Sequence, residues 1–261
     1  MAKTSSTIGK IMSALIKKES VYYNFPVPLI GRLLENPSEA FHEILAWATY
    51  DYLKRHEIED EHGSKALNGE TGWKAIKQAV DALQYNHNGN MVQWYKTCGE
   101  IYKAYKGART GLSINQYWEL REKFSSMPDK EKVLWLAFLS LKSILGNKKY
   151  CITNDLMLFA RMNGLHDAYS NDIEAKYVSS PVIASFFTRR KRETLRRILA
   201  DTFHIAFYSN HDRGYYISTK LSLNKLAEVV EANRRSTIKS HKKRLADAKA
   251  MALAKLAQKP P

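Results

Sequence analysis

Residues 188–219, TRRKRETLRRILADTFHIAFYSNHDRGYYIST, join a strongly basic segment to two short runs of strand-forming residues. The basic segment has apolar residues at helical spacing and is expected to form a helix. The runs HIAFYS (204–209) and YYIST (215–219) are rich in β-branched and aromatic residues, and the polar residues NHDRG (210–214) between them are typical of a turn. The stretch therefore predicts a basic helix that leads directly into a β-hairpin.

The segments before this stretch predict two more helices and a short strand. DKEKVLWLAFLSLKSILG (129–146) is apolar on nearly all sides, which is typical of a helix buried in a domain. KKYCIT (148–153) is expected to be a short strand, and DLMLFARMNG (155–164) a capped helix. The long basic helix is expected to begin near Pro181. Residues 129–219 thus predict the order helix, strand, helix, helix, strand, turn, strand.

This order resembles that of the winged helix-turn-helix superfamily. The resemblance rests on the element order, the basic third helix and an Arg-Gly pair in the turn, and it covers about a third of the chain. The segments LAFLSLKSILGNKKYCITNDLMLFARMNG (136–164) and RGYYIST (213–219) also resemble uncharacterised proteins of bacterial mobile elements and phages. The superfamily resemblance implies DNA binding, in which the helix 181–203 enters the major groove and the tip 211–214 touches the neighbouring backbone.

The rest of the chain predicts a mainly α fold, with the β-hairpin as its small β component. Residues 1–20 are rich in Ser, Thr and Lys and predict a flexible arm, and residues 21–110 predict a helical domain. GARTG (107–111) is interpreted as a break that begins the domain boundary, which leaves 129–220 as the winged-helix domain and 221–261 as a long basic C-terminal helix. The helical patterns outside the winged-helix domain cover residues 29–34, 38–56, 72–85, 91–105 and 113–124.

The net charge of +15 is concentrated at one end of the chain. From Arg189 to the C-terminus there are 18 Lys and Arg against 6 Asp and Glu, a surplus of 12, whereas the preceding 188 residues carry the other 3. Such asymmetry favours a polyanionic partner for that end. A lipid surface is disfavoured because the apolar side of the C-terminal helix is mostly alanine beyond Ile238, and binding to lipid depends on buried apolar area.

Three groups of cations form the predicted nucleic-acid-binding surface: the basic helix, the hairpin tip and the C-terminal helix. In the basic helix Arg outnumbers Lys five to one, and the planar guanidinium suits phosphates and guanine edges. Glu193 and Asp201 are its local acidic partners, too few to neutralise six cations. The alternatives are a solvated face, a plain tight hairpin, and a solubilising or dimer helix. The candidate residues are Arg189, Arg190, Lys191, Arg192, Arg196, Arg197, Arg213, Arg234, Arg235, Lys239, Lys242, Lys243 and Arg244.

The sequence predicts no catalytic residue, no metal site and no cofactor. It lacks the Gly-x-x-x-x-Gly-Lys-Ser/Thr motif of phosphate-binding loops, and the acidic segment 56–62 has no distinctive ligand spacing. Cys98 and Cys151 give no disulfide framework, and Cys151 is expected to be a buried thiol. No apolar run approaches the roughly 18 residues that span a bilayer. A reducing, cytoplasmic location is therefore expected.

The expected function is double-stranded DNA binding without enzymatic activity, as a replication-initiation or regulatory protein of a mobile element or phage. An RNA-binding or nucleoprotein component would use the same charges. A scaffold that mediates protein contacts and forms a homo-oligomer is the other alternative, and an enzyme of an unrecognised type comes last.

Overall fold

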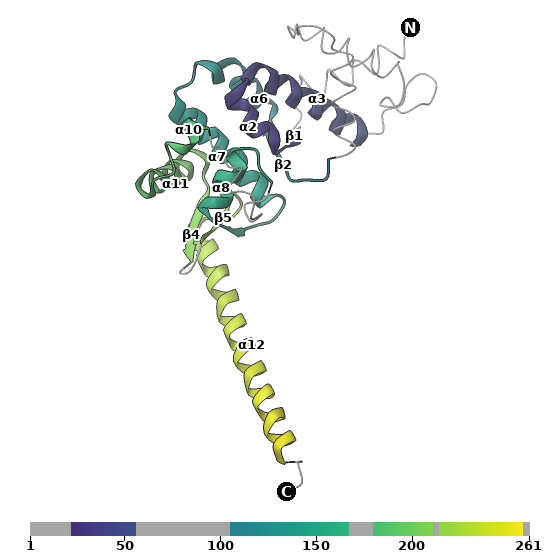
Figure 1. Cartoon of the computed structure of the whole chain (residues 1–261), viewed down its shortest axis with the longest axis vertical. Coiled ribbons are helices and arrows are strands. Elements are labelled where there is room, and N and C mark those ends of the chain that lie inside the picture. The colour runs from purple at the N-terminus through teal and green to yellow at the C-terminus, as the bar shows by residue number, and fades with distance from the viewer. Residues whose placement is uncertain (1–21, 56–104, 167–179, 211–213, 258–261) are drawn as a thin grey trace, which may run out of the picture.

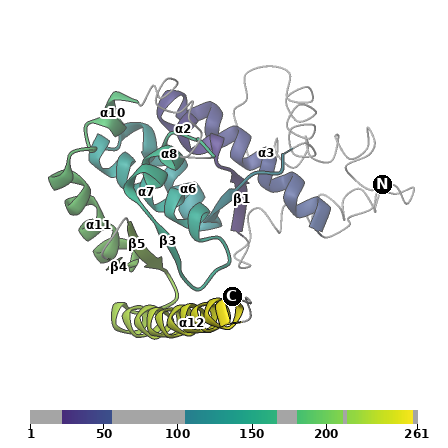
Figure 2. The ribbon, with the colours of Figure 1, turned by 60° about the horizontal axis from the view of Figure 1, so that its bottom comes forward.

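A computed structural model describes residues 22–55, 105–166, 180–210 and 214–257 (Figure 1). It is mainly helical with two small antiparallel sheets, and one long helix projects from the body (Figures 1 and 2). Several predicted segments lie outside the described residues: the arm 1–20, the acidic segment 56–62, the helices 72–85 and 91–104, and the residues 211–213 of the hairpin tip.

The first sheet joins two segments that are far apart in the sequence. Strand β1 (Tyr22–Pro26) pairs antiparallel with β2 (Arg109–Ser113), with Tyr22 opposite Ser113. The prediction of a break at 107–111 is therefore wrong for residues 109–111, which belong to a strand. Isolated Arg, Thr and Gly residues give no strand pattern, and the strand forms because β1 supplies its hydrogen-bonding partner.

Three helices pack beside this sheet: α2 (Pro28–Glu35), α3 (Pro37–Arg55) and α6 (Ile114–Lys123). The start of α6 is a capping box, in which the Ser113 hydroxyl accepts from the Gln116 backbone and the Gln116 side chain accepts from the Ser113 backbone. Ser113 is thus the cap of the helix that the pattern over 113–124 predicted. A short 3₁₀ turn, η1 (Phe124–Ser126), follows α6.

Helix α7 (Asp129–Leu145) is the predicted buried helix, and its side chains reach both parts of the fold. Gly146, with φ +54°, ends it. One continuous hydrophobic core includes Phe25 of β1, Phe41 of α3, Leu139 of α7 and Leu199 of the basic helix. The described parts of the two predicted domains thus share one core.

Lys142 of α7 is mostly buried in that core and donates a hydrogen bond to the carbonyl of Gly111. Its ammonium lies 4.9 Å from the ring centroid of Tyr22. Burial disfavours the charged form and lowers the pKa of Lys142 to about 8. A single lysine therefore ties α7 to both strands of the first sheet.

The second sheet contains β3 (Cys151–Thr153), β4 (Ala206–Asn210) and β5 (Gly214–Ser218) in the antiparallel order β3–β5–β4. Ile152 and Tyr208 both stand opposite Tyr216. Helix α8 (Asp155–Met162) follows β3, and the capped helix that was predicted here has Asn154 as its cap, whose side chain accepts from the Met157 backbone at 2.8 Å. The described elements from α7 to β5 follow the predicted order, except that one predicted helix is divided in two.

The predicted helix 181–203 is two helices, α10 (Pro181–Ala184) and α11 (Arg189–Phe203). The chain turns at 185–188, where the ring of Phe187 packs edge-on against Phe159 at 5.0 Å between centroids. Helical periodicity continues across this turn, so the sequence pattern alone does not show it.

Helix α12 (Leu223–Ala257) has 35 residues and is about 52 Å long. Its first turns are held on the outer face of the second sheet, where Leu226 and Val230 pack against Ala206. Residues 232–251 are exposed, and this part of the helix projects from the body (Figure 1). Within the described residues, no helix is long and apolar enough to cross a membrane.

Candidate nucleic-acid interface

The basic helix α11 is attached to the body by one face. Leu195 and Leu199 are buried in the main core, and the ring of Phe203 stacks on Phe138 with centroids 4.0 Å apart. His204 ends the helix in the left-handed conformation, with φ +53°, and the chain turns there into β4. The opposite face of α11 is left for solvent.

Four of the six predicted cations of α11 are exposed: Arg189, Arg190, Lys191 and Arg197. Lys191 donates a hydrogen bond of 2.7 Å to the backbone carbonyl of Ser185 and lies 5.5 Å from the ring centroid of Phe186. The Arg189 side chain is 88% exposed and pairs with Glu193 of the next turn at 3.1 Å. Such an exposed pair contributes little to stability, so Arg189 can leave Glu193 for another anion.

Arg192 and Arg196 are placed differently, and the expectation that α11 has only Glu193 and Asp201 as acidic partners is wrong. Both arginines pair with Asp155 of α8, at 3.0 Å for Arg192 and 2.7 Å for Arg196. All three side chains are at least 73% buried. Asp155 is far away in the sequence, and the packing of α8 against the body brings it to α11.

Two aromatic rings complete this ion cluster. The guanidinium carbon of Arg196 lies 5.1 Å from the ring centroid of Tyr215, and that of Arg192 lies 5.3 Å from Phe187. Burial, and after it the negative charge of Asp155, raises the pKa of the Tyr215 hydroxyl, which stays protonated. We call Asp155, Arg192, Arg196 and Tyr215 the Asp155 cluster. Its contacts hold α11 in a fixed orientation relative to α8 and the hairpin.

The position of Asp155 follows from local sequence. It is the first residue of α8, directly after the Asn154 cap. A carboxylate in the first turn of a helix is stabilised by the positive end of the helix dipole. The same residue therefore supports the start of α8 and pairs with two cations of α11.

The first residues after the hairpin tip lie against β3. A Cβ atom added to Gly214 would lie 2.2 Å from the carbonyl oxygen of Thr153, so only glycine fits this position. Tyr215 is buried in the main core, and Tyr208 and Tyr216 lie on the opposite face of the sheet. Arg213 lies outside the described residues.

The predicted cations of α12 are all exposed. Arg234 is 3.8 Å from Glu231, which also accepts a hydrogen bond of 2.9 Å from Tyr208. That hydrogen bond is the main cause that raises the pKa of Tyr208. Helix α11 packs on one face of the second sheet and α12 on the other, so the structure places these two basic groups on opposite sides of the sheet. The group on α12 comprises Arg234, Arg235, Lys239, Lys242, Lys243 and Arg244.

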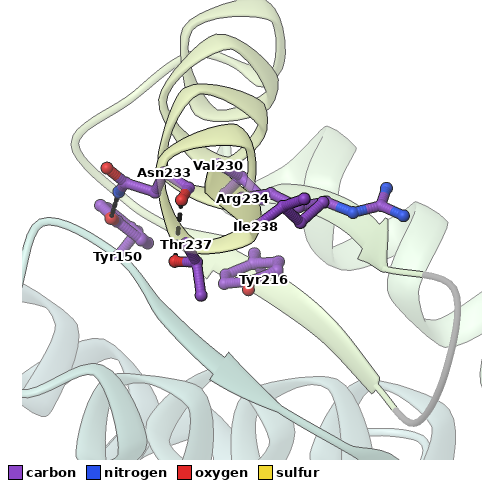
Figure 3. A pocket seen from close by; sticks show the side chains of 7 residues that line it. All are labelled: Tyr150, Tyr216, Val230, Asn233, Arg234, Thr237 and Ile238. Atoms are coloured by element: carbon purple, nitrogen blue, oxygen red, sulfur yellow. Dashed lines mark hydrogen bonds between the residues drawn. The ribbon is translucent and has the colours of Figure 1, made fainter. Parts of the chain in front are cut away.

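A pocket between α12 and the second sheet is a feature that sequence reasoning missed (Figure 3). It is lined by Tyr150 and Tyr216 from the sheet side and by a polar strip of α12. The spacing of Asn233, Arg234 and Thr237 on one helix face was visible in the sequence, but the face that they oppose was not.

The described residues contain no group of three His, Cys, Asp or Glu side chains that could hold a metal ion. Cys151 is half-buried, and its thiol donates a weak hydrogen bond of 3.8 Å to the carbonyl of Ile144. Burial raises the pKa of this thiol, as is typical of an unreactive structural cysteine.

Comparisons of this chain with protein families, with characterised proteins and with solved structures find no significant match.

Proposed function

We propose that this protein binds double-stranded DNA through a winged helix formed by α7, β3, α8, α11 and the β4–β5 hairpin. The sheet order β3–β5–β4 supports this proposal, because the hairpin of a winged helix pairs with the short strand that follows the first helix. In this arrangement α11 is the helix presented to the major groove, and the hairpin tip lies against the neighbouring backbone.

The observation that carries the proposal is the exposed face of α11. Arg189, Arg190 and Arg197 are exposed on a helix whose other face is fixed by Leu195 and Leu199, and the exposed Lys191 adds a cation at the start of the helix. A rigid helix with guanidinium groups on its free face suits contacts to phosphates and to base edges. Arg192 and Arg196 have a different role in this proposal, since they orient α11 through Asp155.

The exposed cations of α12 add a second, sequence-independent attraction for phosphates. The helix extends well beyond the body, so it can follow a bound polyanion away from the hairpin (Figure 1). The wider proposal of a mobile-element or phage protein rests on the sequence resemblance, which implies no particular activity, and the proposed cytoplasmic location rests on the cysteine content and the lack of a long apolar run.

The test removes three exposed cations of α11 in the variant Arg190→Ala, Lys191→Ala, Arg197→Ala. The matched control removes three exposed cations elsewhere, in Lys106→Ala, Lys123→Ala, Lys130→Ala. Affinity for a labelled duplex is measured by fluorescence anisotropy across a salt series. The α11 variant should bind roughly 10- to 100-fold more weakly at moderate salt, and its salt slope should fall by up to about 3.

Equal affinities for the two triple variants would refute the proposed role of α11. Competition of the labelled duplex with unlabelled RNA separates DNA binding from the alternative of RNA binding. Preferential displacement by RNA would favour a nucleoprotein component.

A further inference from the structure

The pocket between α12 and the outer face of the second sheet has a volume of about 300 Å³. Buried Val230 forms its base, and the side chains of Tyr150 and Tyr216 stand opposite α12 (Figure 3). This volume lies at the small end of the range for small-molecule sites, about 300–1,000 Å³. The pocket is thus large enough for one planar ring and little more.

Its aromatic wall suits a flat, aromatic ligand. The rings of Tyr150 and Tyr216 have centroids 6.2 Å apart and are tilted by 56°. Both side chains are partly exposed, so ring surface remains open toward the pocket. A ligand ring that stacks on one tyrosine would meet the other near its edge, and both arrangements are favourable between aromatic rings.

The α12 side of the pocket offers hydrogen bonds to the edge of such a ring. Asn233 donates 2.6 Å to the hydroxyl of Tyr150, which leaves its carbonyl oxygen and second amide hydrogen for a ligand. Thr237 donates 2.9 Å to the backbone carbonyl of Asn233, so its oxygen still accepts (Figure 3). Donors and acceptors therefore lie beside an aromatic wall, as they do in sites that bind unstacked bases.

The charge around the pocket indicates which group the ligand carries next to its ring. Arg234 carries the one formal charge among the described residues that line it, and its side chain is 48% exposed. Two turns beyond Thr237, the exposed Arg244 lies on the same face of α12, whereas Lys239 and Lys243 lie on the opposite face. The pocket thus has one cation at its rim and a second along the same helix face, which fits an aromatic ring attached to phosphates better than a neutral small molecule.

We propose that this pocket binds an unpaired nucleobase of the bound DNA, with the adjoining phosphate on Arg234 and a following phosphate on Arg244. Tyr216 is the second residue after Gly214, so the pocket opens close to the hairpin that contacts the duplex in the proposed function. The pocket faces away from α11, so its base would come from a single-stranded end or an opened site that passes the hairpin. The inference rests on the proposed function and adds to it a preference for junctions between duplex and single strand.

The experiment fills the pocket without removing core residues. Thr237→Trp places a large ring in it from an exposed helix position, and Ala232→Trp places the same ring on the far side of α12, about 140° away around the helix. Three labelled ligands are compared by anisotropy: a blunt duplex, the same duplex with a short thymine tail, and the duplex with an equally long abasic tail.

The wild-type protein should bind the thymine-tailed duplex roughly tenfold more tightly than the blunt one, as expected for one stacked base, and the abasic tail should add much less. Thr237→Trp should lose this preference while its affinity for the blunt duplex is unchanged, and Ala232→Trp should keep it. Equal binding of thymine and abasic tails, or a preference that survives in Thr237→Trp, would overturn the inference and leave duplex binding intact. Failure of the wild type to bind any of the three at low salt would refute the proposed function, and this inference with it.

Discussion

Two pairs of arginines on the same helix should respond to mutation in opposite ways. Arg192→Ala with Arg196→Ala removes both partners of Asp155, whereas Arg190→Ala with Arg197→Ala removes two exposed cations. The two double variants lose the same charge from the same helix and gain the same alanines. They therefore differ chiefly in the Asp155 cluster.

The expected size follows from the burial of the cluster. Breaking a fully buried ion pair costs about 3–5 kcal/mol and an exposed pair at most about 1 kcal/mol. The side chains of Asp155, Arg192 and Arg196 are 18–27% exposed, which places them between these limits. The loss of both pairs and of the ring contacts should lower the free energy of unfolding by about 2–3 kcal/mol, which corresponds to roughly 5–10 °C in melting temperature. The exposed pair should change it by about 0.5 kcal/mol or less.

Urea unfolding followed by tryptophan fluorescence, together with thermal melts, measures both variants. Asp155→Asn should reproduce most of the loss, since it leaves both guanidinium groups without their carboxylate. In the duplex assay, Arg190→Ala with Arg197→Ala should lower the affinity of the folded protein more than Arg192→Ala with Arg196→Ala. Equal unfolding midpoints for the two double variants would show that the Asp155 cluster does not hold α11, and the division of the six cations into two roles would be wrong.

Three further predictions concern other parts of the fold. The pKa of Lys142 is lowered to about 8 in the folded protein, so the unfolded chain binds its proton more tightly. The free energy of unfolding should therefore rise between pH 8 and 10. Lys142→Met should remove about 2–3 kcal/mol of that rise, as measured by urea titrations. Gly214→Ala should lower stability by about 1–3 kcal/mol because its Cβ meets the Thr153 carbonyl, and a melting temperature equal to that of Ser209→Ala would contradict this. Truncation after Lys239 should leave the melting temperature unchanged. It should reduce the slope of log affinity against log salt for duplex binding by about 0.9 for each phosphate that the removed cations neutralise. An unchanged slope would exclude the end of α12 from the interface.

Local signals in the sequence were enough to predict most helices. Ser113 and Asn154 cap α6 and α8 through hydrogen bonds to residues three positions away, and Gly146 adopts the positive φ that ends α7. The continuous apolar pattern of α7 also predicted its burial. These features depend on neighbours within one or two turns, so the sequence contains their whole explanation.

The tertiary structure decided every feature that depends on a distant partner. Strand β2 exists because β1 lies beside it, and the turn before α11 places Phe187 against Phe159 of α8. The candidate interface shows the same division. The sequence by itself determined that the C-terminal part of this chain is basic and that its cations lie on helices. Only the packing of α8 and α11 brought Arg192 and Arg196 to Asp155. Only the docking of α12 on the second sheet formed the pocket. Charge and helical period are local properties of the sequence, whereas the partner of a side chain depends on the tertiary structure.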